Sequence, residues 1–161
     1  MATLTAKLTE SITLDSGTVD STHSLVIDDI ADVTKRVVTA AVAETFLVGF
    51  GTAGSTNLGK SYVAGQFDED EALYLRITNL DSTYHCTLTF KCAGNHEFAV
   101  LLDKGQSFIY NGDLAGGMKA TMDASASALS LSLANLVDVS ALADTQAIQL
   151  EVFVASEASA G

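Results

Sequence analysis

The sequence predicts an all-β protein, an antiparallel β-sandwich of the jelly-roll type. Apolar and polar residues alternate with a period of two through much of the chain, as in strands that bury one face. Turn-forming residues separate these runs into about eight to ten short strands, a number typical of sandwiches and jelly rolls. The chain contains no proline, which often protects edge strands, so we expect loops or another subunit to cover the sheet edges.

The first third of the chain contains strands separated by polar segments. Residues 3–14 alternate Thr with Leu and Ala, which predicts a strand. Turn residues follow, and the polar residues 18–24 predict a connection to a short strand that begins at Leu25. Residues 35–42 predict a strand, which the Val pair favours over one to two helical turns, and residues 45–50 predict another strand. Gly and Ser predict a surface loop over residues 51–60.

The stretch Ala72–Asn111 has the clearest alternation in the chain. Its apolar positions recur on every second residue, and turn residues such as Gly94 and Gly105 interrupt them. This pattern predicts an antiparallel meander of four short strands that is covered on one side, over residues 73–78, 85–92, 97–102 and 106–110.

The last third contains one clear strand, Ala147–Ala155, in which apolar and polar residues alternate. Residues 124–133 alternate Leu with Ser, and we favour a strand over a helix because serines at alternate positions suit a half-exposed sheet. Residues 135–144 are expected to form a connection. The predicted organisation is a single domain over residues 1–161, with a short flexible tail from about residue 156.

The net charge of −12 argues against nucleic acid and against an anionic membrane surface as direct partners. The eight Lys and Arg residues are too scattered to form a basic patch. No apolar run approaches the roughly 20 residues of a membrane-spanning helix, and the N-terminus lacks the apolar core of a signal peptide. We therefore expect a soluble chain made in a cytosol, with no nucleic-acid or membrane partner.

His85, Cys86, Cys92 and His96 provide the atom types that zinc prefers. However, Cys86 and Cys92 fall on one predicted strand, which separates them by roughly 20 Å at about 3.3 Å per residue. That distance excludes a disulfide and a shared metal, and His85 points to the opposite face. We therefore predict buried core thiols and no metal site. The acidic residues 68–71 lack the spacing of a calcium-binding loop and are expected to be solvated.

The sequence contains no motif that predicts an enzyme. A Gly-x-Ser-x-Gly elbow is absent, and none of the three histidines lies in a catalytic motif. Residues 54–61 imitate a phosphate-binding loop, but a strand-like run follows them where that loop requires a helix. We predict no catalytic residues and no cofactor.

Several phrases resemble small virion structural proteins of marine tailed phages, including phages of cyanobacteria. The resemblance covers most of the chain, from about Thr3 to Val154, and does not include the loop 51–60 or the acidic run. The phrases that carry it are Thr9–Leu14, Lys35–Val38, Leu75–Asp81 and Leu102–Phe108. The resemblance implies a component of a phage particle, with no catalytic residues to transfer.

Together with the acidic β fold, the resemblance favours a capsid decoration (cement) protein that binds the outer surface of the head and stabilises it. Its expected partners are the major capsid protein and other copies of the chain, as a homotrimer at quasi-threefold positions. The alternative is a host-recognition or carbohydrate-binding module of the tail or a head fibre, with Tyr62, Tyr84 and Tyr110 as glycan contacts; those tyrosines could instead pack at strand ends or between subunits. The candidate subunit or capsid contacts are Leu4, Leu8, Tyr62, Phe67, Tyr84 and Tyr110.

Overall fold

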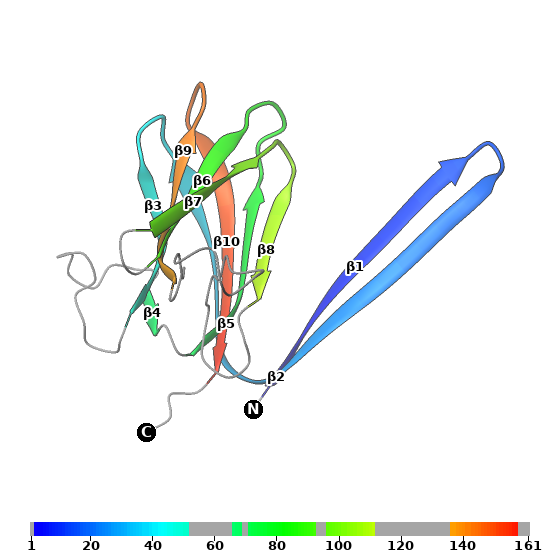
Figure 1. Ribbon diagram of the computed structural model, residues 1–161, viewed down its shortest axis with the longest axis horizontal. Coiled ribbons are helices and arrows are strands. Elements are labelled where there is room, and N and C mark those ends of the chain that lie inside the picture. The colour runs from blue at the N-terminus through cyan, green and yellow to red at the C-terminus, as the bar shows by residue number, and fades with distance from the viewer. Residues whose placement is uncertain (1, 52–65, 69–70, 93–95, 112–135, 158–161) are drawn as a thin grey trace, which may run out of the picture.

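A computed structural model describes residues 2–51, 66–68, 71–92, 96–111 and 136–157 (Figure 1). These residues form strands and connections without a helix, so the prediction of an all-β, mainly antiparallel fold is confirmed. The strands are β1 Ala2–Leu14, β2 Gly17–Ala40, β3 Thr45–Gly51, β4 Gln66–Asp68, β5 Ala72–Asn79, β6 Cys86–Cys92, β7 His96–Leu102, β8 Ser107–Asn111, β9 Leu136–Ala143 and β10 Ile148–Glu157.

The strands form two five-stranded sheets. Sheet A has the order β1-β2-β10-β5-β8, and sheet B has the order β4-β3-β9-β6-β7. All neighbours are antiparallel except β3 and β4, which are parallel. The meander predicted for Ala72–Asn111 is therefore wrong. Its four strands exist, but β5 pairs with β8 in sheet A while β6 pairs with β7 in sheet B.

The main hydrophobic core includes buried side chains from both sheets. Phe90 of β6 is central to it, because its ring stacks on Phe98 of β7 at 4.7 Å and lies 4.8 Å from Phe108 of β8. The alternation of the sequence explains this core: β6 buries every second residue, and β10 does the same from Ile148 to Val154. Burial of these apolar surfaces is the main driving force for the fold.

The prediction of a connection over residues 18–24 and a short strand after it is wrong. Residues 17–40 form one strand of 24 residues, which pairs with β1 along its first half and with β10 along its second half. Polar residues resemble a loop in the sequence, but here they continue a strand pair that has solvent on both faces. The hydrogen bonds to β1, rather than a buried face, define this part of β2.

The prediction of a connection over residues 135–144 is also wrong, because β9 lies in the middle of sheet B between β3 and β6. Asp138 and Ser140 interrupt the apolar pattern, yet both are only 3% exposed. The Ser140 hydroxyl donates a 2.9 Å hydrogen bond to Glu44, which allows one of these polar groups to be buried in the sheet.

The remaining predicted strands are confirmed as β1, the second half of β2, β3, β5 to β8 and β10. The predicted strand 124–133 and the predicted loop 51–60 lie outside the described residues except for Gly51, which ends β3. β10 continues to Glu157, and the rest of the predicted tail lies outside the description. Among the described residues, no helix has the length and apolar character that crossing a bilayer requires.

Candidate functional site

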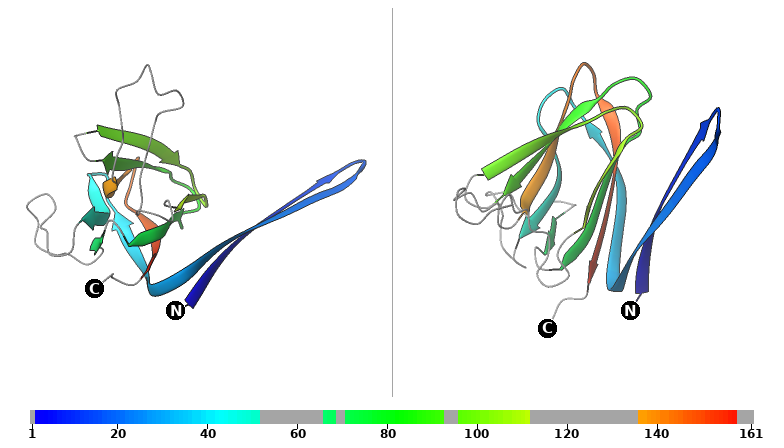
Figure 2. Two further views of the ribbon diagram at one scale, coloured as in Figure 1. Left: turned by 60° about the horizontal axis from the view of Figure 1, so that its bottom comes forward. Right: turned by 45° about the vertical axis from the view of Figure 1, so that its right-hand side comes forward.

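The most unusual feature of the molecule is a long two-stranded arm, formed by β1 and residues 17–30 of β2. It extends away from the two sheets in all three views of the ribbon (Figures 1 and 2). A two-residue turn, Asp15 and Ser16, connects its strands at the tip. Every residue from Lys7 to Ser24 is exposed.

The arm has one apolar and one polar face, because its strands pair in register and side chains alternate between the faces. The apolar face carries the even residues of β1 and the odd residues of β2 that pair with them. Its outer part exposes Leu8, Ile12, Leu14 and Val19, whose exposed fractions are 54%, 55%, 50% and 59%. Water therefore contacts an apolar strip that Glu10, Ser21 and His23 interrupt. Exposed apolar side chains grouped in this way mark an interaction surface on a soluble protein.

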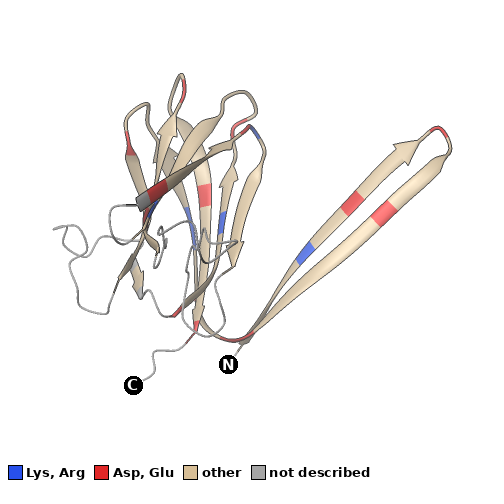
Figure 3. Cartoon of the chain, in the orientation of Figure 1, with Lys and Arg blue, Asp and Glu red and all other residues tan. Residues whose placement is uncertain are grey.

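The opposite face of the arm consists mainly of Thr, Ser and acidic residues. Ser11 donates a 2.5 Å hydrogen bond to Asp20, and Thr3 donates one of 2.9 Å to Asp28. Charged residues are sparse between the tip and the base of the arm, as Figure 3 shows. This polar face is suited to remain in water while the apolar face is covered.

A bulge marks the base of the arm. Leu4 pairs with Ile27 but Ala2 pairs with Ile30, so the register of the two strands shifts there. Asp29 within this bulge has a φ of 63°, in the left-handed region that Asp tolerates better than most residues. Bulges bend and twist a strand pair, and this one lies where the arm leaves sheet A.

The base of the arm packs on the outer face of sheet A. A second hydrophobic cluster forms there, separate from the main core, and contains Leu73, Tyr74 and Ala155 from the sheet. The residues of the arm in or against this cluster are Leu4, Ala6, Leu25, Ile27 and Ile30. The Tyr74 ring meets Phe153 edge to face at 5.9 Å. The arm therefore explains why Tyr74 of β5 is buried on a face of the sheet that would otherwise contact solvent.

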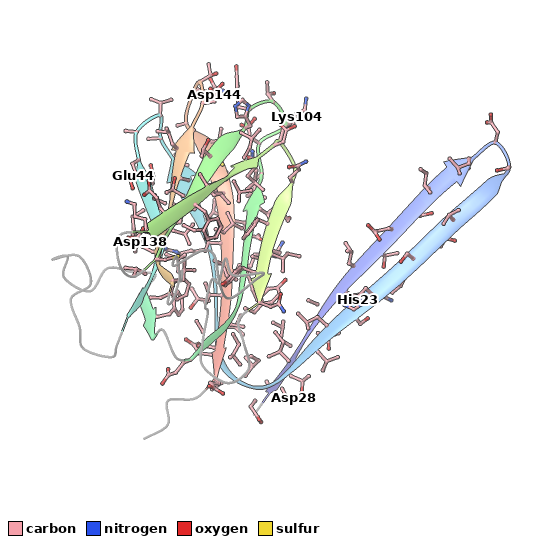
Figure 4. All side chains as sticks on the ribbon, in the orientation of Figure 1. His23, Asp28, Glu44, Lys104, Asp138 and Asp144 are labelled. Atoms are coloured by element: carbon pink, nitrogen blue, oxygen red, sulfur yellow. The ribbon has the colours of Figure 1, made fainter. Side chains whose placement is uncertain are left out.

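Beyond this cluster the arm and the sheet diverge, leaving a groove with a volume of about 530 Å³. Figure 4 shows the side chains of the arm, with His23 labelled along it and Asp28 at its base. The groove is lined on the arm by Leu4, Thr5, Ala6, Lys7, Leu8, His23 and Leu25, and on sheet A by Tyr74, Arg76, Ile109, Asn111 and Phe153. It thus combines apolar side chains, aromatic rings and a few polar groups.

A charged network lies on the outer face of sheet A beside the groove. Glu151 accepts hydrogen bonds of 2.6 Å from Arg76 and 2.8 Å from Lys35, which come from the strands on either side. Arg76 also lies 5.7 Å from the centre of the Phe153 ring, within the range of a cation–π contact. The hydrogen bond from Lys35, and then the one from Arg76, lowers the pKa of the Glu151 carboxyl.

The candidate contact residues from the sequence fall into two groups. Leu4 and Leu8 lie on the apolar face of the arm and line the groove. Phe67, Tyr84 and Tyr110 pack against the main core, and Tyr62 lies outside the described residues. Sequence reasoning missed Tyr74, Phe153 and Ile109 as groove residues, because a pattern within one strand cannot show that a distant arm covers them.

The two cysteines lie in the main core. Cys86 and Cys92 are free and buried at opposite ends of β6, as predicted, and burial raises the pKa of Cys86 to about 11. His85 lies 3.7 Å from Asp144 near the surface. Within the described ranges, no three His, Cys, Asp or Glu side chains converge as metal ligands would; the side chain of His96 is not described.

Comparisons with protein-family models, with curated proteins and with solved structures find no match. A function for this chain is therefore inferred from the arm and the groove. Their chemistry is that of a binding surface, with an exposed apolar strip beside aromatic and charged groups.

Proposed function

We propose that this chain is a structural protein of a phage virion, a decoration (cement) protein that binds the outside of the head and stabilises it. The observation that carries the proposal is the arm, whose outer half exposes Leu8, Ile12, Leu14 and Val19 on one face. A soluble protein rarely leaves such a strip in water unless another macromolecule covers it. An extended arm of this kind suits a subunit that joins its neighbours in an assembly.

The strand order supports this proposal. In sheet A the strands β2-β10-β5-β8 are adjacent, and in sheet B the strands β3-β9-β6-β7 are adjacent. We assign this order to a jelly roll, in which eight strands form two packed sheets. Jelly rolls occur in viral capsid proteins and in lectins. The fold alone does not assign a function, and it adds weight only together with the arm and the resemblance to virion proteins.

The charge of the chain also supports a place on the exterior of the particle. With a net charge of −12, the protein would be repelled by packaged DNA. The outer surface of a shell of major capsid proteins does not impose this penalty. The proposed partners are therefore the major capsid protein and further copies of this chain, with a homotrimer at the quasi-threefold positions of the lattice.

The test is to image phage particles made without this gene by cryo-electron microscopy, and then to add back the purified protein. Loss of density on the head exterior, restored by the added protein, is the expected result. A reduced resistance of the heads to heat should accompany the loss. Unchanged density over the whole head surface would rule out the proposal.

A second candidate is a glycan-binding module, and the composition of the groove favours it. Phe153 provides an aromatic ring, and Arg76 and Asn111 provide polar groups, around the same groove of 530 Å³. Tyr74 also lines the groove but is only 4% exposed. Aromatic and polar groups in one concave site are typical of ligand pockets. Glycan-array binding by the isolated protein, without binding to heads that lack it, would favour this second candidate over the first.

A further inference from the structure

We infer that the outer half of the arm, residues 7–24, docks on the outer face of sheet A of a second copy of this chain. The partner of the arm is thus a second copy of the chain. This inference rests on the proposed function, which gives the reason for the protein to assemble. The arm needs a partner on physical grounds, because an isolated two-stranded hairpin is at best marginally stable in water. A surface that covers its apolar face would provide the missing layer.

The base of the arm shows that these two surfaces fit each other. There the apolar face of the arm already packs on the outer face of sheet A, with Leu4 and Ala6 near Tyr74 and Phe153. The outer part of the arm moves away from its own sheet (Figure 1). Leu8 is the last residue of β1 that lines the groove between them. Both surfaces then continue without cover: the strip on the arm, and Val37 and Ile109 on the sheet, which are 53% and 48% exposed.

Charge on the two surfaces is also complementary. On the outer face of sheet A, Lys35 and Arg76 share one carboxylate, Glu151, which leaves an excess of one positive charge in this network. The apolar face of the arm carries Glu10 between Leu8 and Ile12. A local attraction of this kind helps two copies approach in spite of their net charge of −12 each.

A second copy fits better than a foreign partner because every copy carries both surfaces. One arm-to-sheet contact covers an exposed strip on one chain and an exposed sheet face on another. Because the contact joins two different surfaces, it can close as a reciprocal two-fold pair, in which each arm meets the sheet of the other chain, or head to tail as a ring.

The experiment measures the mass of the purified full chain by sedimentation velocity over a range of concentrations. The wild-type protein is expected to be an oligomer at micromolar concentration. The arm variant Leu8→Ser/Ile12→Ser should raise the dissociation constant by ~100-fold or more, since two buried apolar side chains would be lost from the contact. The control Thr9→Ser/Thr13→Ser changes the polar face at the same spacing and should leave the mass unchanged.

A mixing experiment tests where the arm docks. The sheet variant Val37→Ser/Ile109→Ser should also be monomeric, because it removes the docking face and keeps the arm. Mixed with the arm variant, it should form a 1:1 complex, in which its intact arm meets the intact sheet face of the other chain. All four substituted residues are exposed in the single chain, and circular dichroism would establish that the variants fold.

The inference is overturned if the wild-type protein stays monomeric at about 100 μM, well above the range of stable assemblies. It is also overturned if the arm variant still assembles or if the mixture does not form the complex. A sheet variant that still assembles by itself would overturn it too, because that result would indicate contact between two arms. Binding to phage heads is a separate measurement. A monomer that binds heads would contradict this inference alone, whereas an arm-dependent oligomer that binds no heads would contradict only the proposed function.

Discussion

Glu151 on β10 accepts a 2.6 Å hydrogen bond from Arg76 on the neighbouring strand β5. Lys35 on β2, the other neighbour of β10, donates to the second oxygen of the same carboxylate. The Glu151 side chain is only 14% exposed, so this network connects three adjacent strands of sheet A under partial cover. It also fixes Arg76 at the groove, where the arm and the sheet diverge.

Replacing Glu151 with Gln should lower the free energy of unfolding by about 1 kcal/mol at pH 7, because the two cations lose their shared counter-charge. The pKa of Glu151 is lowered in the folded state, so its contribution is complete above the ordinary glutamate value of about 4.3. The contribution is then lost as the pH falls through the lower, folded-state pKa. Urea denaturation of both proteins between pH 7 and pH 3 measures this difference.

The matched control is Glu157→Gln on the same strand, which should have a smaller effect at all pH values. A gap between wild type and Glu151→Gln that stays constant down to pH 3 would contradict an electrostatic role for Glu151.

Asn79 should be among the polar residues most sensitive to substitution. It is 1% exposed, and its amide donates to the carbonyl oxygens of Tyr84 at 2.9 Å and Asp103 at 3.3 Å. Its own side-chain oxygen accepts from the Asp81 backbone at 2.9 Å. Asn79→Ala leaves these buried groups without partners and should cost about 2–3 kcal/mol of unfolding free energy.

Asn79→Asp changes the hydrogen bonds of this side chain while its size stays nearly the same. At pH 7 it would place a carboxylate against carbonyl oxygens, whereas the protonated acid at low pH can donate to one of them. Its loss of stability should therefore shrink as the pH falls. Asn111→Asp, on an exposed position of β8, is the control and should show no such recovery. Equal pH profiles for the two variants would contradict the hydrogen-bonding role of Asn79.

The sequence predicted strands in which apolar and polar residues alternate, including β1, most of which is exposed on both faces. In other predicted strands this alternation matches burial of one face. β6 and β10 are examples, because every second side chain enters the main core. β9 was missed because Asp138 and Ser140 interrupt its pattern although the sheet buries both. The first half of β2 was missed because residues 18–24 are almost all polar, so no apolar alternation marks the strand.

The candidate site was predictable on the arm and not on the sheet. Leu4 and Leu8 follow from the alternation of residues 3–14, which defines an apolar face before the fold is known. Tyr74 and Phe153 occupy outward positions of their strands, and they are covered because β1 returns to them from far away in the sequence. No local pattern contains that contact.

Cys86 and Cys92 should be inert to thiol reagents in the folded protein. Both are buried, and the Cys86 pKa of about 11 leaves roughly one thiolate in a thousand at pH 8, so access and ionisation both limit the reaction. We expect the reaction with Ellman's reagent to follow unfolding of the sheet. Addition of guanidinium chloride should then release two reactive thiols per chain. A thiol that reacts within seconds in the native protein would contradict the position of β6 in the core.

Asp29 should tolerate glycine better than any residue with a side chain. Its φ of 63° costs an ordinary L-residue about 1–2 kcal/mol, and glycine avoids this cost. Asp29→Gly is therefore expected to change the free energy of unfolding by less than about 0.5 kcal/mol, while Asp29→Val should lower it by about 1–2 kcal/mol. Chemical denaturation of the chain measures both.

The control for Asp29 places the same glycine at Ser24, an exposed residue of β2 that pairs in register with Lys7 of β1. Ser24→Gly should lower the free energy of unfolding by about 0.5–1 kcal/mol, because glycine weakens an ordinary strand. A smaller cost of glycine at Asp29 than at Ser24 would mean that the left-handed bulge exists in solution. If Asp29→Gly costs as much as Ser24→Gly, the bulge does not set the path of the chain at the base of the arm. Hydrogen exchange of the backbone amides in Asp29→Val shows which strands are destabilised. If the bulge orients the arm, the amides of β1 should exchange faster while those of β10 keep their protection.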